Sequence, residues 1–280
     1  FYDWNGKEYG DDTRLISHIE KAAFVGCRSV LVVPGFLNEE ISKKMNEYRK
    51  NLQILELPLE KLGQLANMVK ADVFYHLAWN GSAGIDREDF DIQYTNIAYT
   101  AEAIRTAVKC GCHKFIGAGS QAEYGVIHGV AKEEETVPKP FMMYGATKVA
   151  AYQMGRVLAR QLGISFVWPR IYSVYGVGEN PGTLVNYVID TLQKGKKPEL
   201  SPCENMWNFM YITDCVKALR ILGEREETEG IYHVASEDNP KPLLHSCPQQ
   251  IRLYLSEIQY SLCNRHCAAF WQYPFQESDP

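Results

Sequence analysis

The chain has 280 residues, of which 46% are hydrophobic, and its formal net charge is −5, from 34 acidic and 29 basic residues. This length and apolar content argue against a disordered chain and are enough to bury a sizeable core. Charges of both signs are mixed along the chain, which argues against nucleic acid as a partner. No apolar run approaches the ~18 residues of a membrane helix, so we expect a cytoplasmic protein with no membrane contact.

In chain order, four apolar stretches predict buried parallel strands, with helical patterns between them. The stretches are SVLVVP (29–34), ADVFYHLA (71–78), KFIGAGS (114–120) and ISFVWPR (164–170). Two long segments, 94–111 and 144–163, have apolar residues at helical spacing and a glycine after the last turn. The alternation of strands and helices predicts an α/β fold with a doubly wound parallel sheet.

The two ends of the chain do not follow this pattern. Residues 1–28 show no recognisable strand followed by a G-x-x-G-x-x-G turn. After residue 176 come further helical segments and a short strand, 230–236, which we expect to return to the sheet. We therefore predict a sheet domain over residues 1–176 and a small annex over residues 177–280.

The eight cysteines are scattered along the chain, and several lie inside periodic segments, so we expect reduced thiols. A group of possible metal ligands stands near the carboxyl end: His245, Cys247, Cys263, His266 and Cys267. Their spacing contains no C-x-x-C pair and fits no zinc signature, so we predict no metal site.

Tyr144 and Lys148 are four residues apart in a predicted helix and therefore share one of its faces. A nearby ammonium favours the ionised phenol, so it lowers the pKa of a group that titrates at about 10 in free tyrosine. Such a pair can act as a general acid and base. The same spacing also occurs on ordinary solvated helix faces, and that alternative stays open.

Ser120 lies in the glycine-containing segment GAGSQAEYG (117–125), directly after a predicted strand. Open α/β sheets bind ligands beyond the carboxyl ends of their strands, so we expect Ser120 to share a crevice with Tyr144. Its hydroxyl would then hydrogen-bond a substrate carbonyl or alkoxide. A serine that only forms the turn is the alternative.

These residues and several ordered motifs resemble a known family over roughly residues 70–236. The motifs are DVFYHLAW, NIAYTAEAI, PRIYSVYGVG and NFMYITDCVKAL. The chain resembles the extended short-chain dehydrogenases/reductases, the NAD(P)-dependent nucleotide-sugar epimerase/dehydratase family. This resemblance implies a Rossmann-like domain that binds NAD or NADP, and an annex that binds a nucleotide-diphosphate sugar. Relatives pair through the two long helices, so it also implies a homodimer.

The resemblance carries roles onto individual residues of this chain. The catalytic residues would be Ser120, Tyr144 and Lys148. The cofactor would contact Leu77, Ala78, Asn96, Ala118, Tyr144, Lys148 and Pro169. The substrate would contact Ser120, Gln121, Arg170 and Ser173, where Ser173 replaces the asparagine that is usual in the family.

Departures from the family pattern narrow the expected reaction. Gln121 and Ala122 stand where 4,6-dehydratases carry the Asp-Glu pair that eliminates water, and Ala122 also replaces the cysteine of relatives that epimerise next to the ketone. The remaining chemistry is hydride transfer at C4, either reduction of a 4-keto sugar or 4-epimerisation. The loop GSQAEYG is similar to that of 4-ketoreductases, which favours reduction weakly.

The largest departure is the absence of a glycine-rich turn, which in relatives places the pyrophosphate of the cofactor at a helix N-terminus. The strand SVLVVP also lacks the acidic residue that would bind the adenosine ribose. The alternative hypothesis is therefore a degenerate or truncated relative, which binds a nucleotide sugar without catalysis because it has no working dinucleotide site.

Overall fold

The structure is a computed structural model that describes residues 29–33, 52–176, 183–200, 206–236 and 241–242. The chain forms two compact units, residues 1–183 with 208–239, and residues 184–207 with 240–280. The predictions for residues 1–28 and for the histidines and cysteines after residue 243 lie outside the described residues. The domain boundary expected at residue 176 stays a prediction.

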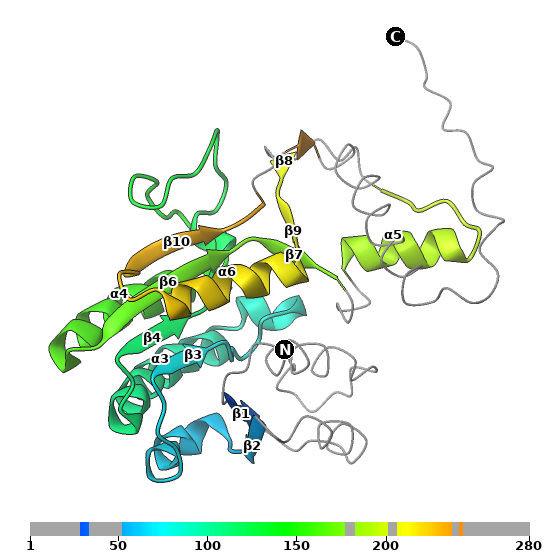
Figure 1. Ribbon diagram of the computed structural model, residues 1–280. Helices are drawn as coiled ribbons and strands as arrows, with labels where there is room; N and C mark the ends of the chain where they lie inside the picture. The colour runs from blue at the N-terminus through cyan, green and yellow to red at the C-terminus, as the bar shows by residue number, and fades with distance from the viewer. Residues whose placement is uncertain (1–28, 34–51, 177–182, 201–205, 237–240, 243–280) are drawn as a thin grey trace. The chain divides into compact units, whose positions relative to one another are not determined.

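The first unit is built on a parallel sheet with the strand order β10-β6-β4-β3 (Figure 1). Its strands are β3 (Val73–His76), β4 (Lys114–Gly117), β6 (Ser165–Ile171) and β10 (Gly230–Val234). After β4 ends, the short strand β5 (Gly119–Ser120) pairs with the carboxyl end of β6. All of these pairs are parallel, which confirms the predicted α/β fold.

A second parallel pair is formed by β1 (Ser29–Val33) and β2 (Leu52–Glu56). Val30, Val32 and Leu55 of this pair pack against the same core as the main sheet. Among the described residues, no strand pairing joins β1 or β2 to β3. The sequence analysis did not predict β2, because the segment LQILE is short and interrupted by a polar and an acidic side chain.

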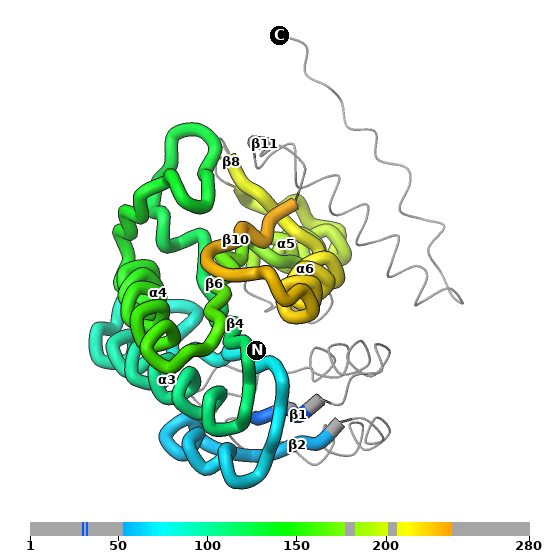
Figure 2. Tube along the Cα trace, turned by 60° about the vertical axis from the view of Figure 1, so that its left-hand side comes forward, coloured from blue at the N-terminus to red at the C-terminus, as the bar shows by residue number. Residues whose placement is uncertain are grey.

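Helices cover both faces of the main sheet in the first unit. The helices α3 (Phe90–Cys110) and α4 (Met143–Leu162) lie side by side on one face, and α6 (Ile212–Glu224) lies on the other (Figures 1 and 2). Side chains alternate along a strand, so Phe115 packs in the core towards α3 and α4, whereas Ile116 packs in the core towards α6. The sheet is thus the middle of three layers.

Both long helices end as their sequences predict. Gly111 follows α3 with φ 87°, and Gly163 follows α4 with φ 72°, the left-handed conformation that glycine adopts without steric cost. At the other end of α3, the Asp89 side chain accepts a hydrogen bond from the Ile92 backbone N–H at 2.9 Å. These ends fix the lengths of the helices that carry Asn96 and Tyr144.

Shorter elements complete the first unit. They are η2 (Leu59–Asn67), η3 (Gly84–Glu88), η4 (Gln121–Glu123), and the parallel pair β7 (Ser173–Tyr175) and β9 (Phe209–Tyr211). Three cysteines in the described part of this unit, Cys110, Cys112 and Cys215, are buried free thiols, as expected.

The second unit contains α5 (Leu184–Gln193) and an antiparallel pair of β8 (Met206–Trp207) with β11 (Lys241–Pro242). Across the parts of both units that the structure describes, no helix has the length and apolar character needed to cross a membrane.

Candidate active site

The loop after β4 positions Ser120. Ser120 is the N-cap of η4: its hydroxyl accepts a hydrogen bond from the Ala122 backbone N–H at 3.2 Å, and its own backbone N–H donates to Oε1 of Glu123 at 2.9 Å. This reciprocal arrangement is a capping box, which satisfies two backbone donors at the start of a helical turn. The serine expected at the end of a strand therefore stands in a fixed turn at the carboxyl end of the sheet.

Helix α4 approaches this loop through Gly145. A Cβ atom at Gly145 would lie 2.3 Å from the carbonyl oxygen of Ala122, a distance that no real side chain shows. Only glycine therefore allows the first turn of α4 to pack directly on the turn that holds Ser120. This contact brings Tyr144, the neighbour of Gly145, next to Ser120, close enough for the Ser120 side chain to act on the pKa of the Tyr144 phenol.

Lys148 lies one turn further along α4 and is almost completely buried, with 2% of its surface exposed. Its Nζ donates a hydrogen bond to the Ala118 carbonyl oxygen at 2.6 Å. The same ammonium lies 3.5 Å from the centre of the Trp79 ring and 5.6 Å from the centre of the Tyr144 ring. The structure thus brings together the three residues that the sequence analysis expects to be catalytic. Nζ of Lys148 lies closer to the Ala118 carbonyl and the Trp79 ring than to the Tyr144 ring.

The electrostatics of the pair differ from the sequence expectation. Burial raises the pKa of Tyr144, while the side chain of Ser120 and the charge of Arg87 act in the opposite direction. Burial also lowers the pKa of Lys148 to about 7, opposed by the negative charge of Glu123. The expected drop in the pKa of Tyr144 is not found, because the cost of removing a phenolate from water exceeds the stabilisation by neighbouring groups.

The loop after β3 contains Leu77 and Ala78, which were expected to line the cofactor. Two buried amide side chains of α3 hold the next residues: Asn96 accepts a hydrogen bond from the Asn80 N–H at 2.7 Å and donates to the Asn80 carbonyl at 3.0 Å. Gln93 donates to the Gly81 carbonyl at 2.6 Å and accepts from the Trp79 indole at 3.0 Å. Asn96 therefore fixes the path of this loop, and its contribution to a cofactor site would be through the loop.

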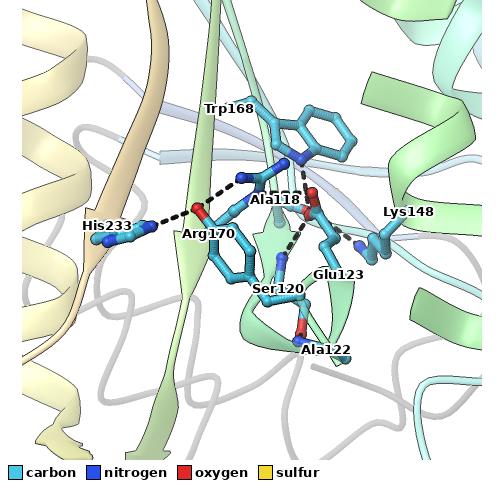
Figure 3. A network of polar contacts seen from close by, with 9 residues as sticks. Ala118, Ser120, Ala122, Glu123, Lys148, Trp168, Arg170 and His233 are labelled. Atoms are coloured by element: carbon cyan, nitrogen blue, oxygen red, sulfur yellow. Dashed lines mark hydrogen bonds and ion pairs between the residues drawn. The ribbon is translucent and has the colours of Figure 1, made fainter. Parts of the chain in front are cut away.

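A buried charged network surrounds Glu123, beside the serine turn (Figure 3). Oε2 of Glu123 pairs with Nε of Arg170 at 2.7 Å, and Oε1 accepts a hydrogen bond from the Trp168 indole at 2.9 Å. Arg170 donates a second hydrogen bond to the Tyr124 hydroxyl at 2.6 Å, and that hydroxyl contacts Nε2 of His233 at 2.5 Å. A line of polar contacts thus runs from the backbone of Ser120 to β10.

The structure places the expected substrate residues in two groups. Gln121 and Ser173 meet, because the Gln121 side-chain amide donates to the Ser173 hydroxyl at 3.0 Å. Arg170 is 1% exposed and lies in its ion pair with Glu123, which argues against a direct contact with substrate and makes it a support of the loop.

Pro169, which was expected to contact the cofactor, is buried in β6 and paired with Tyr232 of β10.

Four residues of the site were not singled out from the sequence: Trp79, Arg87, Glu123 and His76. The guanidinium carbon of Arg87 lies 4.5 Å from the centre of the Tyr144 ring. Burial and the nearby charge of Lys148 lower the pKa of His76 to about 3, so this imidazole is neutral near pH 7. Glu123 was visible as an acidic residue inside the glycine-containing segment, whereas no local pattern marks Arg87.

A parallel α/β sheet with serine, tyrosine and lysine gathered beyond the carboxyl ends of its strands defines a Rossmann-type domain. Residues 36–235 match the model of the NAD dependent epimerase/dehydratase family. The chain belongs to this family, and the resemblance expected from its motifs is confirmed.

Individual relatives are distant. The chain is 24% identical to the dTDP-D-glucose 4,6-dehydratase of Mus musculus over 71% of its own length and 56% of that protein. It is 22% identical to the dTDP-4-dehydro-6-deoxyglucose reductase of Escherichia coli over 71% of its length and 65% of that protein. The chain thus spans less than two thirds of the length of these relatives.

Among solved structures, the chain is similar to UDP-glucuronic acid 4-epimerase from Bacillus cereus in complex with NAD. The TM-score is 0.69 at 20% identity, over 84% of this chain and 78% of that chain. At 20% identity, this likeness shows a shared fold and no more.

Proposed function

We propose that the chain is an NAD(P)-dependent oxidoreductase or epimerase that transfers a hydride at C4 of a nucleotide-linked sugar. The observation that carries this proposal is the packing of α4 at Gly145 on the turn of Ser120, which places Tyr144 beside Ser120 and beside the buried Lys148. The family membership and the likeness to a UDP-sugar 4-epimerase support the substrate class. The reaction would be reduction of a 4-keto sugar or 4-epimerisation.

In this proposal Tyr144 moves the proton of the sugar C4 hydroxyl, and Ser120 holds the same oxygen by a hydrogen bond. Lys148 orients the nicotinamide ribose: an ammonium has three donors, and Ala118 takes one of them. The bound dinucleotide would supply or accept the hydride. These donors fit a nicotinamide riboside, and Leu77, Ala78, Asn96 and Pro169 would complete the cofactor site.

The proposal favours hydride transfer over dehydration because of the residues beside Ser120. Gln121 uses its amide to bind Ser173, and Ala122 has no acid or base group. A dehydratase needs both an additional acid and an additional base at these positions. The pair of Gln121 and Ser173 would instead contact the sugar.

A second candidate is a nucleotide-sugar-binding relative without redox activity. The observation that favours it is the sequence itself, which contains no G-x-x-G-x-x-G turn at any position. Such a chain would keep the sheet and the annex while lacking tight binding of the pyrophosphate.

The first test is a titration of the purified chain with NADH and NADPH, followed by nicotinamide fluorescence and by the shift in thermal unfolding. Binding should be followed by turnover of UDP- or dTDP-linked 4-keto sugars or 4-epimers. Tyr144→Phe should reduce turnover by about 10²–10⁴-fold with unchanged unfolding, while Tyr94→Phe on α3 serves as the matched control. Retained turnover in Tyr144→Phe would refute the assignment, and sugar binding without dinucleotide binding would favour the second candidate.

We also propose that the chain forms a cytoplasmic homodimer through α3 and α4. Phe90 and Tyr94 are each 59% exposed on α3 with their rings stacked at 5.8 Å, and Met154 is 61% exposed on α4. Burying these side chains between two copies would remove apolar surface from water. Sedimentation should give a dimer for the wild type and a monomer for the double variant Tyr94→Glu/Met154→Glu. A monomeric wild type would contradict the proposal.

A further inference from the structure

Among the described residues, Arg87 is the cation that lies closest to the ring of Tyr144. Its guanidinium carbon lies 4.5 Å from the ring centre, compared with 5.6 Å for Nζ of Lys148. The Nε atom of Arg87 is buried and has no hydrogen-bond partner within the described residues. A buried guanidinium nitrogen that lacks a partner is costly, so its position beside the phenol ring calls for an explanation.

Two hydrogen bonds on either side of Arg87 anchor the element that carries it. Glu88 accepts a hydrogen bond from the Met143 backbone N–H at 3.1 Å, which attaches η3 to the first turn of α4. Gln93, which is fully buried, donates to the Asp86 carbonyl at 2.9 Å. The backbone of Arg87 is therefore held in place beside Tyr144, and this anchoring directs its side chain to the ring.

Lys148 is less suited to supply a constant positive charge to the phenol. Its Nζ is directed at the Ala118 carbonyl, 2.6 Å away, and at the face of Trp79. Burial lowers the pKa of Lys148 to about 7, so the charge of this side chain depends on pH near neutrality. A guanidinium stays charged throughout this range.

The other charged or titratable groups around Tyr144 do not replace Arg87. Glu123 of η4 opposes ionisation of the phenol because its charge is negative. Glu88 of η3 is also negative. His76 of β3 is neutral near pH 7, because burial and the charge of Lys148 lower its pKa to about 3.

We propose that Arg87, more than Lys148, supplies the positive charge that favours the ionised form of the Tyr144 phenol and holds its ring in place. Arg87 is thus a positioning residue that acts through Tyr144, and its catalytic meaning rests on the function proposed above. A cation over the face of an aromatic ring is attracted by the ring, and more strongly when the ring becomes a phenolate. In that function, the charge would help Tyr144 take the proton from the sugar hydroxyl.

The test measures the ionisation of residue 144 directly, in the chain alone. A ring-fluorinated tyrosine placed at position 144 has a more acidic phenol, so its titration falls where the fold persists, and fluorine NMR follows that single residue. Arg87→Met keeps an apolar chain on the ring without the charge, and it should raise the midpoint of the titration by about 1 pH unit. Arg87→Gln should do the same, and Arg87→Lys should restore most of the wild-type midpoint. Arg105→Gln, at an exposed arginine of α3, is the matched control.

An unchanged midpoint in Arg87→Met and Arg87→Gln, or a larger increase in Lys148→Met than in either, would overturn the proposal. Arg87→Lys keeps the positive charge. If its midpoint rises as far as that of Arg87→Met, the charge is not responsible, and the proposal fails as well. The measurement needs neither cofactor nor sugar. A shift in midpoint without any turnover would therefore refute the proposed function and leave this inference standing. Turnover with an unchanged midpoint would support the proposed function and refute this inference.

Discussion

Glu123 and Arg170 form an ion pair at 2.7 Å in the interior of the first unit, with side chains that are 0% and 1% exposed. The carboxylate also receives the backbone N–H of Ser120, so the pair connects the middle of the sheet to the turn that carries the serine. Buried charges are tolerated when they are paired and fully hydrogen-bonded, which is the case for Glu123. The geometry of Ser120 therefore depends on an ion pair in the interior of the first unit.

Removing one partner of this pair should destabilise the protein strongly. Glu123→Gln leaves the Arg170 guanidinium buried without its counter-charge, and we expect a loss of about 3–5 kcal/mol in the free energy of unfolding, measured by denaturant titration. The matched control is Glu224→Gln, which breaks a pair of similar geometry on the exposed face of α6, at 2.6 Å from Arg220, and should cost less than about 1 kcal/mol. Equal losses in the two variants would contradict the structural role of Glu123.

Adding a single methyl group at Gly145 should destabilise the protein. Gly145→Ala places a methyl group against the Ala122 carbonyl, so helix and loop must separate, at a cost of about 1–3 kcal/mol. We also expect lower turnover, because the separation moves Tyr144 away from Ser120. Ala146→Ser, at the exposed next position, is the control for both measurements. Wild-type stability in Gly145→Ala would show that the close approach of α4 to the loop is not required.

Local periodicity explains how much of this arrangement was predictable. The spacing of Tyr144 and Lys148 puts them on one helix face, and the strand before Ser120 puts the serine at the sheet edge, so these elements follow from short-range patterns. The pairing of Glu123 with Arg170 spans 47 residues, and no local pattern encodes it. Arg87 was missed for the same reason, since it reaches Tyr144 only through the packing of η3 on α4.

The electrostatic part of the site was less predictable than its geometry. Sequence spacing predicts that Lys148 is near Tyr144, but it does not predict burial, which changes the pKa of both groups. The contact of Lys148 with Trp79 likewise depends on the loop after β3, whose path is set by Gln93 and Asn96. Long-range packing thus decides which cation acts on the phenol.

His76 should make the protein less stable in acid. Its pKa in the folded chain is about 3, below the usual 6.5, because of burial and the charge of Lys148. The unfolded chain therefore binds a proton that the folded chain does not, and stability falls as pH decreases below about 6.5, by about 1.4 kcal/mol per pH unit for this group. Denaturant titrations between pH 7 and about 5 should show a shallower dependence for His76→Gln than for the wild type.

The exposed His128 provides the comparison for this slope. His128→Gln removes an exposed imidazole and so controls for the histidine-to-glutamine change itself. A slope in His76→Gln that equals that of the wild type would show that His76 accepts a proton in the folded chain as readily as in the unfolded one.

Lys148 should reduce the stability of the chain at neutral pH. Its pKa is about 7 in the folded chain, below the usual 10.5, with burial as the main cause. The unfolded chain binds the additional proton between these two pH values, so this contribution to stability increases as pH rises from 7 towards 10.5 and is lost as pH falls through that range. Lys148→Met should therefore raise the free energy of unfolding at pH 7 by a few kcal/mol while removing the proposed activity. Lys61→Met, at an exposed lysine of η2, should leave both unchanged, and a destabilised Lys148→Met would mean that the contacts with Ala118 and Trp79 outweigh the cost of burying the charge.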